Sequence, residues 1–332
     1  MSVVYIRFVA RPSPPLQRSP LIERLIVRAS SSAQVRDWRA DAFGLMAPPG
    51  MRMPPVATMA LRGGVAGVVT GAVTGAAGPG ADTGAAEGPW VCVVSPVHLS
   101  AGMTHVTFPV AGMLQMEAAE AAALAADFNR VFANGGVRMA VGAAGTLVCV
   151  FDEALQVATH DPETAVGRDV FDFQPSGRDA PRLRRLSSEI EMWLFDHAVN
   201  RQRTGRGLPA ITGLWFWGGG AAYADIPALP LWAAGRDVFF AGFGEAAEWS
   251  RQSGSGVVVV DDHPGSATWP EVERRWLQPA LAELRAGLLQ QIHVSAGQRR
   301  FTIPRGLNLR FWRRPRPWWD YFDTRDGERD GE

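Results

Sequence analysis

Short apolar runs alternate with amphipathic stretches along most of the chain. Runs rich in Val, Ile and aromatic residues predict β-strands, and stretches with apolar residues three and four positions apart predict helices. Strands that alternate with helices are typical of a mostly parallel sheet covered by helices. We therefore predict an α/β protein, and the pattern leaves room for a smaller inserted or N-terminal subdomain.

The predicted elements are found in both halves of the chain. Strands are predicted for residues 1–8, 90–96, 103–110, 137–141, 146–151, 214–217, 237–241 and 257–260, with edge strands within 301–312. Helices are predicted for residues 21–29, 117–132 and 245–251. Two further helices are predicted from apolar faces, one formed by Leu183, Leu186, Ile190, Trp193 and Leu194 and the other by Val272, Trp276, Ala280, Leu284 and Leu288.

Two stretches of unusual composition divide the chain. Residues 63–88 are almost wholly Gly, Ala, Val and Thr, and 19 of them, from Gly63 to Ala81, carry no charge. Glycine dominates and leucine is absent, so a flexible surface insertion is favoured over a membrane span. Residues 159–181 are polar and contain Pro and Gly, which is typical of a linker. The predicted parts are a strand-helix segment (1–62), the insertion (63–88), a small α/β subdomain (89–158), the linker (159–181), a Trp-rich α/β domain (182–319) and an acidic tail (320–332).

The amino-acid composition excludes several classes of partner and of enzyme. The chain has 33 basic and 33 acidic residues, which argues against nucleic acid or a charged membrane surface as an overall partner. Every basic residue is Arg, so neither a Schiff-base lysine nor a P-loop lysine is present. Cys92 and Cys149 lie in apolar runs and are expected to be buried, reduced thiols. The start of the chain looks like a strand and not a signal peptide, so we expect a cytoplasmic protein.

A polar helix end and a run of glycines form the candidate anion site. His197, Asn200, Arg201 and Arg203 fall within two helical turns, where Arg offers bidentate contacts to an anion. After the apolar strand that contains Trp215 and Trp217, the backbone of Gly218, Gly219 and Gly220 can cradle a phosphate. A solvated helix end, and tight packing beneath the tryptophans, are the alternatives. Open α/β sheets place ligands at such strand ends.

The sequence gives little support for metal binding, nucleophilic catalysis or nucleic-acid binding. His98, His105, Asp261 and His263 are the candidate metal ligands, but no recognised ligand spacing joins them, so no metal is expected. The sequence has no Gly-x-Ser-x-Gly elbow, and neither cysteine has a neighbouring His for nucleophilic catalysis. The Arg- and Trp-rich residues 310–319 are followed by acidic residues, so we expect their tryptophans to dock on the core and not to bind nucleic acid.

Several segments together resemble one family. The chain resembles the proteobacterial proteins labelled phosphoglycerate mutase or RpfE-type regulatory protein, which are distantly similar to archaeal-type cofactor-independent phosphoglycerate mutases of the alkaline phosphatase superfamily. This resemblance implies an alkaline-phosphatase-like sheet and covers about residues 90–315. The segments that carry it are 96–99, 189–203, 214–220, 276–288 and 311–314.

The chain also departs from that family. Ser95 stands where the family usually has Asp, and Thr212-Gly213 replaces Asn-Ser. The true mutases use two divalent metals and a Ser nucleophile, yet this sequence has no N-terminal Asp-Gly motif, no matching serine and no Gly-Asp-His-Ser/Thr segment. The first hypothesis is a degenerate, non-catalytic mutase-like protein that binds a phosphorylated or acidic small molecule or a regulatory partner. An active Mn- or Mg-dependent phosphotransfer enzyme and a purely structural or regulatory interaction protein are the alternatives.

Overall fold

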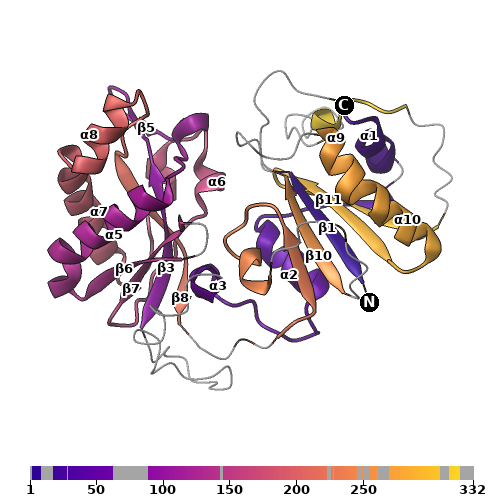
Figure 1. Ribbon diagram of the computed structural model, residues 1–332, viewed down its shortest axis with the longest axis horizontal. Coiled ribbons are helices and arrows are strands. Elements are labelled where there is room, and N and C mark those ends of the chain that lie inside the picture. The colour runs from indigo at the N-terminus through magenta and orange to yellow at the C-terminus, as the bar shows by residue number, and fades with distance from the viewer. Residues whose placement is uncertain are drawn as a thin grey trace. The chain divides into compact units, whose positions relative to one another are not determined.

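The chain folds into two compact units. The computed structural model describes residues 2–8, 18–27, 29–62, 89–142, 145–222, 226, 228–244, 249, 254–260, 269–306 and 314–321. Unit 1 comprises residues 1–53 and 228–332, and unit 2 comprises residues 54–227. Unit 1 therefore combines both ends of the sequence, whereas unit 2 is continuous (Figure 1).

Unit 1 is built on a mixed sheet that is mostly parallel. Among the described residues its strand order is β2-β12-β11-β1-β10-β9. The neighbours β11, β1, β10 and β9 run parallel, and β12 and β2 add an antiparallel edge. This arrangement agrees with the predicted α/β class. The strands are β1 (Val3–Phe8), β2 (Ser31–Gln34), β9 (Leu231–Ala234), β10 (Ser255–Val260), β11 (Gln291–Ala296) and β12 (Arg299–Pro304).

The two faces of this sheet differ in polarity. Val4, Ile6 and Phe8 point to an apolar face, which packs against α1 (Pro20–Val27), α9 (Trp269–Val272) and α10 (Gln278–Ala286). Tyr5 and Arg7 alternate with them and point to the opposite face, beside α2 (Trp38–Met46) and η5 (Phe240–Phe243). Figure 1 shows α2 on one side of β1 and α10 on the other.

A π-helical segment joins α9 to α10. Residues Glu273–Leu277 form η6, which leads directly into α10. Pro279 explains the wider turn, because its ring has no N–H and clashes with the carbonyl four residues earlier. The helix ends at Ala286 and Gly287 caps it with φ 80°, so the predicted apolar face is wrong at Leu288, which is 64% exposed. Leu289 is buried in its place.

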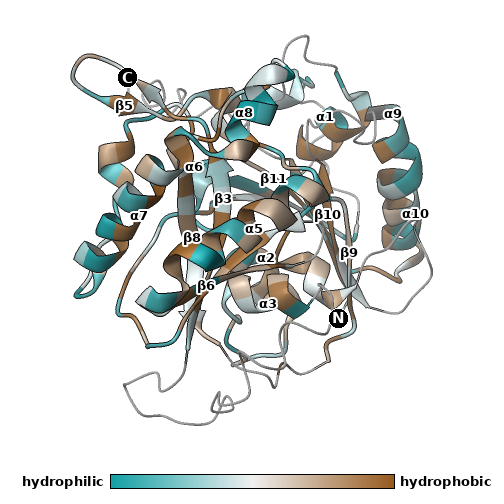
Figure 2. Ribbon diagram, turned by 60° about the vertical axis from the view of Figure 1, so that its left-hand side comes forward, coloured by the Kyte–Doolittle hydropathy of each residue, from teal (hydrophilic) through white to brown (hydrophobic). Residues whose placement is uncertain are grey.

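Unit 2 contains an antiparallel sheet of the order β6-β7-β3-β8. Apolar side chains on one face pack with α5, α7 and α8, and α3 packs on the other face of β3 and β8 (Figure 1). The hydropathy colouring shows polar outer faces on α7 and α10 (Figure 2). The elements are α3 (Val56–Arg62), β3 (Trp90–Val97), β4 (Ser100–Ala101), β5 (Val106–Thr107), α5 (Ala118–Phe132), β6 (Val137–Val141), β7 (Leu147–Phe151), α6 (Pro162–Ala165), α7 (Ala180–Phe195), α8 (Ala198–Gly205) and β8 (Gly213–Ala221).

Some predicted strands differ from the structure. The strand predicted at 103–110 is reduced to the two-residue β5, which is followed by a 3₁₀ turn. The strand predicted at 237–241 is wrong, because the Asp237 carboxylate accepts hydrogen bonds from the N–H groups of Phe239 and Phe240 and starts the 3₁₀ helix η5. The strand of that region is β9, earlier in the chain.

The compact units divide the chain at 53/54 and 227/228, which differs from the segments expected from the sequence. The expected linker 159–181 lies inside unit 2, where it contains α6 and the 3₁₀ helix η4 (Val170–Phe173). Asp169 bridges to Thr107, and Ser176 bridges to Ala158, so isolated bridges join this segment to its surroundings at two points. The insertion 63–88, most of the predicted helix 245–251, residues 307–313 and the tail from 322 onward lie outside the described residues.

Two other sequence predictions concern the core and the membrane. Trp318 in η7 (Trp318–Tyr321) is buried with its ring 5.4 Å from that of Phe8, so the predicted docking of this segment is confirmed at that residue. Cys92 and Cys149 are confirmed as buried and free. No helix within the described ranges has the length and apolar composition needed to cross a membrane.

Candidate functional site

His197 caps the helix that carries the predicted anion site. It precedes α8, and its Nδ1 accepts a hydrogen bond of 3.2 Å from the N–H of Val199. Its Nε2 lies 3.1 Å from Oδ2 of Asp127, and its ring packs against Trp193. Burial lowers the pKa of His197, and the charge of Arg201 acts in the same direction. The imidazole is therefore a neutral helix cap.

The amide of Asn200 is fully used inside the protein. Its Nδ2 donates to the carbonyls of Leu194 and Ile211, both at 2.8 Å, and its Oδ1 accepts from the N–H of Ile211 at 2.7 Å. Asn200 is buried, so these bonds fasten the end of α7 to the segment that enters β8.

The two arginines of α8 have different environments. Arg203 is buried and donates to the carbonyls of Pro209 and Gln115 and to the Glu120 carboxylate, at 2.9 Å for the last. Arg201 is exposed and pairs with the carbonyl and carboxylate of Asp196. The predicted residues of α8 are thus neighbours, but their hydrogen bonds are made to groups of the protein itself.

The three glycines lie at the far end of β8. Gly213 starts this strand two residues after Ile211, which bonds to Asn200 of α8, and Gly218 follows five residues later, a span of about 17 Å. The register of β8 against β3 shifts between Val91 and Val93, and Gly218 has φ 62°, which marks a β-bulge. The structure therefore does not bring the glycines and the α8 side chains together.

Close packing accounts for each glycine of this run. A Cβ at Gly218 would lie 2.7 Å from Val56, and one at Gly220 would lie 2.7 Å from Pro55. A Cβ at Gly219 would overlap the ring of Trp90. β8 also belongs to an antiparallel sheet, so the rule that places ligands at the ends of parallel strands does not apply to it.

The two tryptophans of β8 also form hydrogen bonds within the protein. The indole N–H of Trp215 donates to the carbonyl of His160, and that of Trp217 donates to the hydroxyl of Ser95 at 2.9 Å. Ser95 is the residue that stands where the resembled family usually has Asp, and here it holds the ring of a strand tryptophan.

The candidate metal ligands are scattered. His98 Nδ1 lies 2.8 Å from the carbonyl of Ala210, and His105 lies on an exposed turn beside Thr104. Asp261 and His263 fall outside the described residues. Within the described part of the chain, no group of three or more His, Cys, Asp or Glu side chains could hold a metal ion.

A different polar set lies on one face of the unit 1 sheet. Strand register aligns two rows of residues across β1, β11 and β12 on the α2 side. Side chains in these rows bond to one another and to Asp41 of α2. The first row is Tyr5, His293 and Thr302, and the second row is Arg7, Ser295 and Arg300.

His293 is a neutral donor in this set. Its Nδ1 lies 2.9 Å from the Arg300 guanidinium, which can only donate, so the ring proton resides on Nε2. Nε2 is buried and has no hydrogen-bond partner. Burial lowers the pKa of His293 to about 4, with a further contribution from Arg300.

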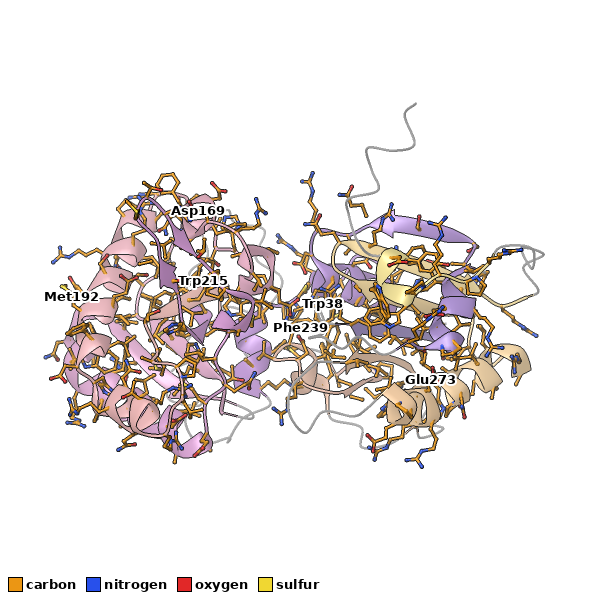
Figure 3. The ribbon with its side chains drawn as sticks, turned by 90° about the horizontal axis from the view of Figure 1, so that it is seen from above. Trp38, Asp169, Met192, Trp215, Phe239 and Glu273 are labelled. Carbon is orange, nitrogen blue, oxygen red and sulfur yellow. The ribbon has the colours of Figure 1, made fainter. Side chains whose placement is uncertain are left out.

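Trp38 presents a second buried donor. Its Nε1 has no hydrogen-bond partner, although the side chain is only 5% exposed. The guanidinium groups of Arg7 and Arg39 lie 5.3 Å and 4.6 Å from the centre of its ring. Figure 3 shows Trp38 near Phe239 of the loop that follows β9.

Among the described residues, the carboxylate of Asp41 contacts this set. Oδ2 of Asp41 accepts from Tyr5 at 3.1 Å and lies 2.9 Å from Nε of Arg300. Burial raises the pKa of Asp41, and Arg300 opposes that shift. Asp237 is paired with Arg39 at 2.8 Å, and both side chains are buried.

Sequence reasoning missed this polar set. The available signal was alternation, since Tyr5 and Arg7 interrupt an apolar first strand at every second position, and His293 and Ser295 do the same later. The pairing of β1 with β11 brings together residues nearly 300 positions apart in the sequence, and no local sequence pattern predicts such a pairing.

Comparison with known proteins gives one weak sequence match. The chain is 28% identical over 111 residues to the 2,3-bisphosphoglycerate-independent phosphoglycerate mutase of Methanothrix thermoacetophila. This match covers 33% of the chain and 27% of the relative, so only about a quarter of that protein is represented. The chain has weak similarity to a cofactor-independent phosphoglycerate mutase. No protein-family model matches it.

Two solved structures align over most of the chain. The cofactor-independent phosphoglycerate mutase from Thermoplasma acidophilum has a TM-score of 0.36 and 14% identity, covering 91% of this chain and 89% of that one. The PH0037 protein from Pyrococcus horikoshii has a TM-score of 0.33 and 11% identity, covering 91% and 87% respectively.

Proposed function

We propose that the chain is a degenerate mutase-like protein of the RpfE type, which binds a phosphorylated or acidic small molecule without turning it over. The binding site would lie on the polar face of the unit 1 sheet. The observation that carries this proposal is the pair of buried, unpartnered donors, Nε1 of Trp38 and Nε2 of His293. The weak similarity to a phosphoglycerate mutase supports the choice of ligand class.

An anion suits the chemistry of this face. A buried donor without an acceptor costs about 1–3 kcal/mol. Arginines lie beside both rings: Arg300 contacts His293 at its other nitrogen, Nδ1, and the guanidiniums of Arg7 and Arg39 lie over Trp38. A phosphate or carboxylate offers several acceptor oxygens and a negative charge, so it would satisfy the donors and be stabilised by the neighbouring cations.

The two-metal chemistry of phosphoglycerate mutases does not fit the described residues. Such metals stabilise the transferring phosphoryl group and need a set of carboxylate and imidazole ligands. At the carboxyl ends of β1 and β11 the chain instead carries Arg7, Phe8, Ser295 and Ala296. The only imidazole of the two rows, His293, is already bonded to Arg300 through Nδ1. We therefore derive no metal-dependent step.

Ligand-induced stabilisation tests the binding site. We expect 3-phosphoglycerate to raise the melting temperature of the full chain, and Trp38→Phe, which keeps the ring and removes the N–H, to reduce that shift at least fivefold. Arg201→Ala is the matched control, because Arg201 is exposed and pairs with Asp196. If Arg201→Ala abolishes the shift and Trp38→Phe does not, the site belongs to α8 and the proposal for the sheet is wrong.

Metal analysis separates this proposal from the enzyme alternative. Under that alternative the purified protein would hold stoichiometric Mn or Mg, with His98, His105, Asp261 and His263 as the candidate ligands, and would interconvert phosphoglycerates. We expect neither bound metal nor turnover in a mutase assay supplied with manganese. Stoichiometric metal together with turnover would overturn the proposal.

A protein partner is the second candidate. Several large apolar side chains of unit 2 are highly exposed, and Met192 lies at its outer margin (Figure 3). The others include Met103, Phe171 and Phe195. Failure of phosphoglycerates, inorganic phosphate and glycerate alike to shift the melting temperature would favour this role.

The proposal also includes a cytoplasmic location. The two free, buried cysteines support this location, because disulfides are rare in cytosolic proteins.

A further inference from the structure

Two large apolar side chains are exposed on the outward side of α7. Leu183, Ile190 and Leu194 turn the other side of this helix toward the unit 2 core. Met192 and Phe195 are 71% and 91% exposed, and Figure 3 shows Met192 at the outer margin of unit 2. Residues three positions apart are neighbours on a helix surface. The outward side of a surface helix is usually polar, so this apolar pair indicates an interaction surface.

The same side of α7 is basic in its first half. Arg184 and Arg185 are exposed and lie about two turns before Met192. At 100° per residue, the exposed residues fall within a sector of about 120°, opposite the buried ones. We call this sector the outer α7 face, and it consists of Arg184, Arg185, Ser188, Glu191, Met192 and Phe195.

The carboxylate of this face lacks a cation partner among the described residues. Partial burial raises the pKa of Glu191, and no neighbouring charge opposes that shift. Arg184 is exposed and donates one hydrogen bond from Nη1 to the carbonyl of Pro175, at 2.8 Å. A guanidinium has five N–H donors, so Arg184 can bind a further acceptor. Each end of the outer α7 face therefore offers what the other end needs.

We propose that the outer α7 face is the interface of a homodimer, in which the two copies of α7 pack antiparallel about a twofold axis near Ser188. In a twofold contact the same surface is used on both subunits. Arg184 lies four residues before Ser188, and Glu191 lies three residues after it. Reversal of one helix against the other therefore brings Arg184 to the level of the partner subunit's Glu191.

The helical spacing also sets the lateral position of these groups. Glu191 and Phe195 are four residues apart, on one edge of the face. The twofold operation places Arg184 of the second copy on that same edge, between the two side chains. Its guanidinium can then pair with the carboxylate and lie against the aromatic ring. Arg185 falls on the other edge, where its aliphatic stem covers the partner subunit's Met192.

Charge complementarity favours a second copy as the occupant. The outer α7 face is basic at one end and carries an acidic and two apolar side chains at the other. A reversed copy matches both ends at once, and the small side chain of Ser188 lets the two helices approach closely where they cross. A parallel copy would place arginines against arginines.

This interface is separate from the proposed anion site. α7 belongs to unit 2, whereas the polar face that contains His293 belongs to unit 1. The test below uses no ligand, so its outcome does not depend on phosphoglycerate binding. A monomeric protein that is still stabilised by 3-phosphoglycerate would overturn the interface alone.

Sedimentation equilibrium of the full chain over a range of concentrations tests the proposal. We expect a monomer–dimer equilibrium, and Phe195→Ala should weaken dimerisation about tenfold or more. Phe171→Ala is the matched control, because Phe171 is also a highly exposed phenylalanine of unit 2 but lies in η4, and it should dimerise as the wild type does. Circular dichroism shows whether each variant is folded.

A charge exchange tests the antiparallel arrangement itself. Glu191→Arg places like charges together across the interface and should weaken dimerisation, whereas the double variant Arg184→Glu/Glu191→Arg restores opposite charges and should recover it. A wild type that is monomeric at all concentrations would overturn the proposal. Equal weakening by Phe171→Ala, or a double variant that dimerises no better than Glu191→Arg, would overturn it as well.

Discussion

The side-chain amide of Asn129 pairs with both backbone groups of Met139. Nδ2 donates to the carbonyl at 2.8 Å, and Oδ1 accepts from the N–H at 2.7 Å. Met139 lies in β6, the edge strand of the unit 2 sheet, and Asn129 lies in α5, which packs against it. The amide occupies the place that the backbone of a further strand would take, and so it protects the edge from pairing.

Replacement of Asn129 should therefore weaken unit 2 and expose an edge. Asn129→Ala removes two hydrogen bonds from backbone groups, and we expect the free energy of unfolding in urea to fall by about 2 kcal/mol. Light scattering should show more self-association in the same variant. Asn134→Ala is the control, since Asn134 is exposed in the next turn, and a similar loss there would contradict the explanation.

Gly219→Ala should be strongly destabilising. The added Cβ overlaps the Trp90 ring, and this overlap requires a shift of a tightly packed side chain at a cost of about 1–3 kcal/mol. Gly205→Ala is the control, because nothing lies within 4 Å of its Cβ position in α8, and alanine there should stabilise the helix by about 0.5 kcal/mol or more. Thermal unfolding of both variants measures the contrast. Equal effects would show that packing does not explain the glycine run.

The two arginines of α8 should respond differently to truncation. Arg203→Ala removes one of the two arginine partners of the buried Glu120 carboxylate, which keeps its pair with Arg206, and we expect a loss of about 1.5–3 kcal/mol in the free energy of unfolding. Arg201→Ala breaks an exposed pair with Asp196, for which about 0–1 kcal/mol is expected. Chemical unfolding at neutral pH compares the two, and a large loss for Arg201→Ala alone would contradict the structural assignment.

Acid should destabilise unit 1 through His293. The pKa of His293 is 6.5 unperturbed and about 4 in the folded chain. Between these values the unfolded chain binds a proton that the folded chain does not, so stability is complete above pH 6.5 and is lost as the pH falls toward 4. The shift corresponds to about 3 kcal/mol.

Urea unfolding at pH 7 and pH 4.5 measures this effect. His197, whose pKa is also lowered, acts in the same direction, so the comparison is between the wild type and His293→Asn. We expect a smaller pH dependence in His293→Asn than in the wild type or in His105→Ala, which alters an exposed turn. An unchanged profile in His293→Asn would contradict the assignment to His293.

Local sequence patterns correctly predicted the elements whose residues clearly favour either a strand or a helix. The β-branched run that ends at Val260 forms β10, and the Ala-rich stretch that ends at Phe132 forms α5. Prediction failed where the hydrogen bonds of a single polar side chain determine the backbone conformation. Asp237, for example, starts a 3₁₀ helix where a strand was predicted. The helix α3, after Pro54 and Pro55, was not predicted, because its prolines resemble a loop and its apolar residues fit the glycines of β8.

The site could be predicted only in part. The proximity of His197, Asn200 and Arg203 follows from helical spacing, but their partners include backbone carbonyls such as Ile211 and Pro209, which have no sequence signature. The polar face of unit 1 depends on the pairing of β1 with β11 and β12, so its residues meet only in the folded chain.

The position of β1 in its sheet has a consequence for biosynthesis. Its parallel partners are β10 and β11, which are translated more than 240 residues later. When the ribosome has completed residue 227, the whole of unit 2 has been made, while the first strand still lacks both neighbours. Unit 2 can therefore fold first, and the Val3–Phe8 segment, rich in β-branched and aromatic residues, must wait until the end of translation for its place. During that interval this segment needs protection from aggregation.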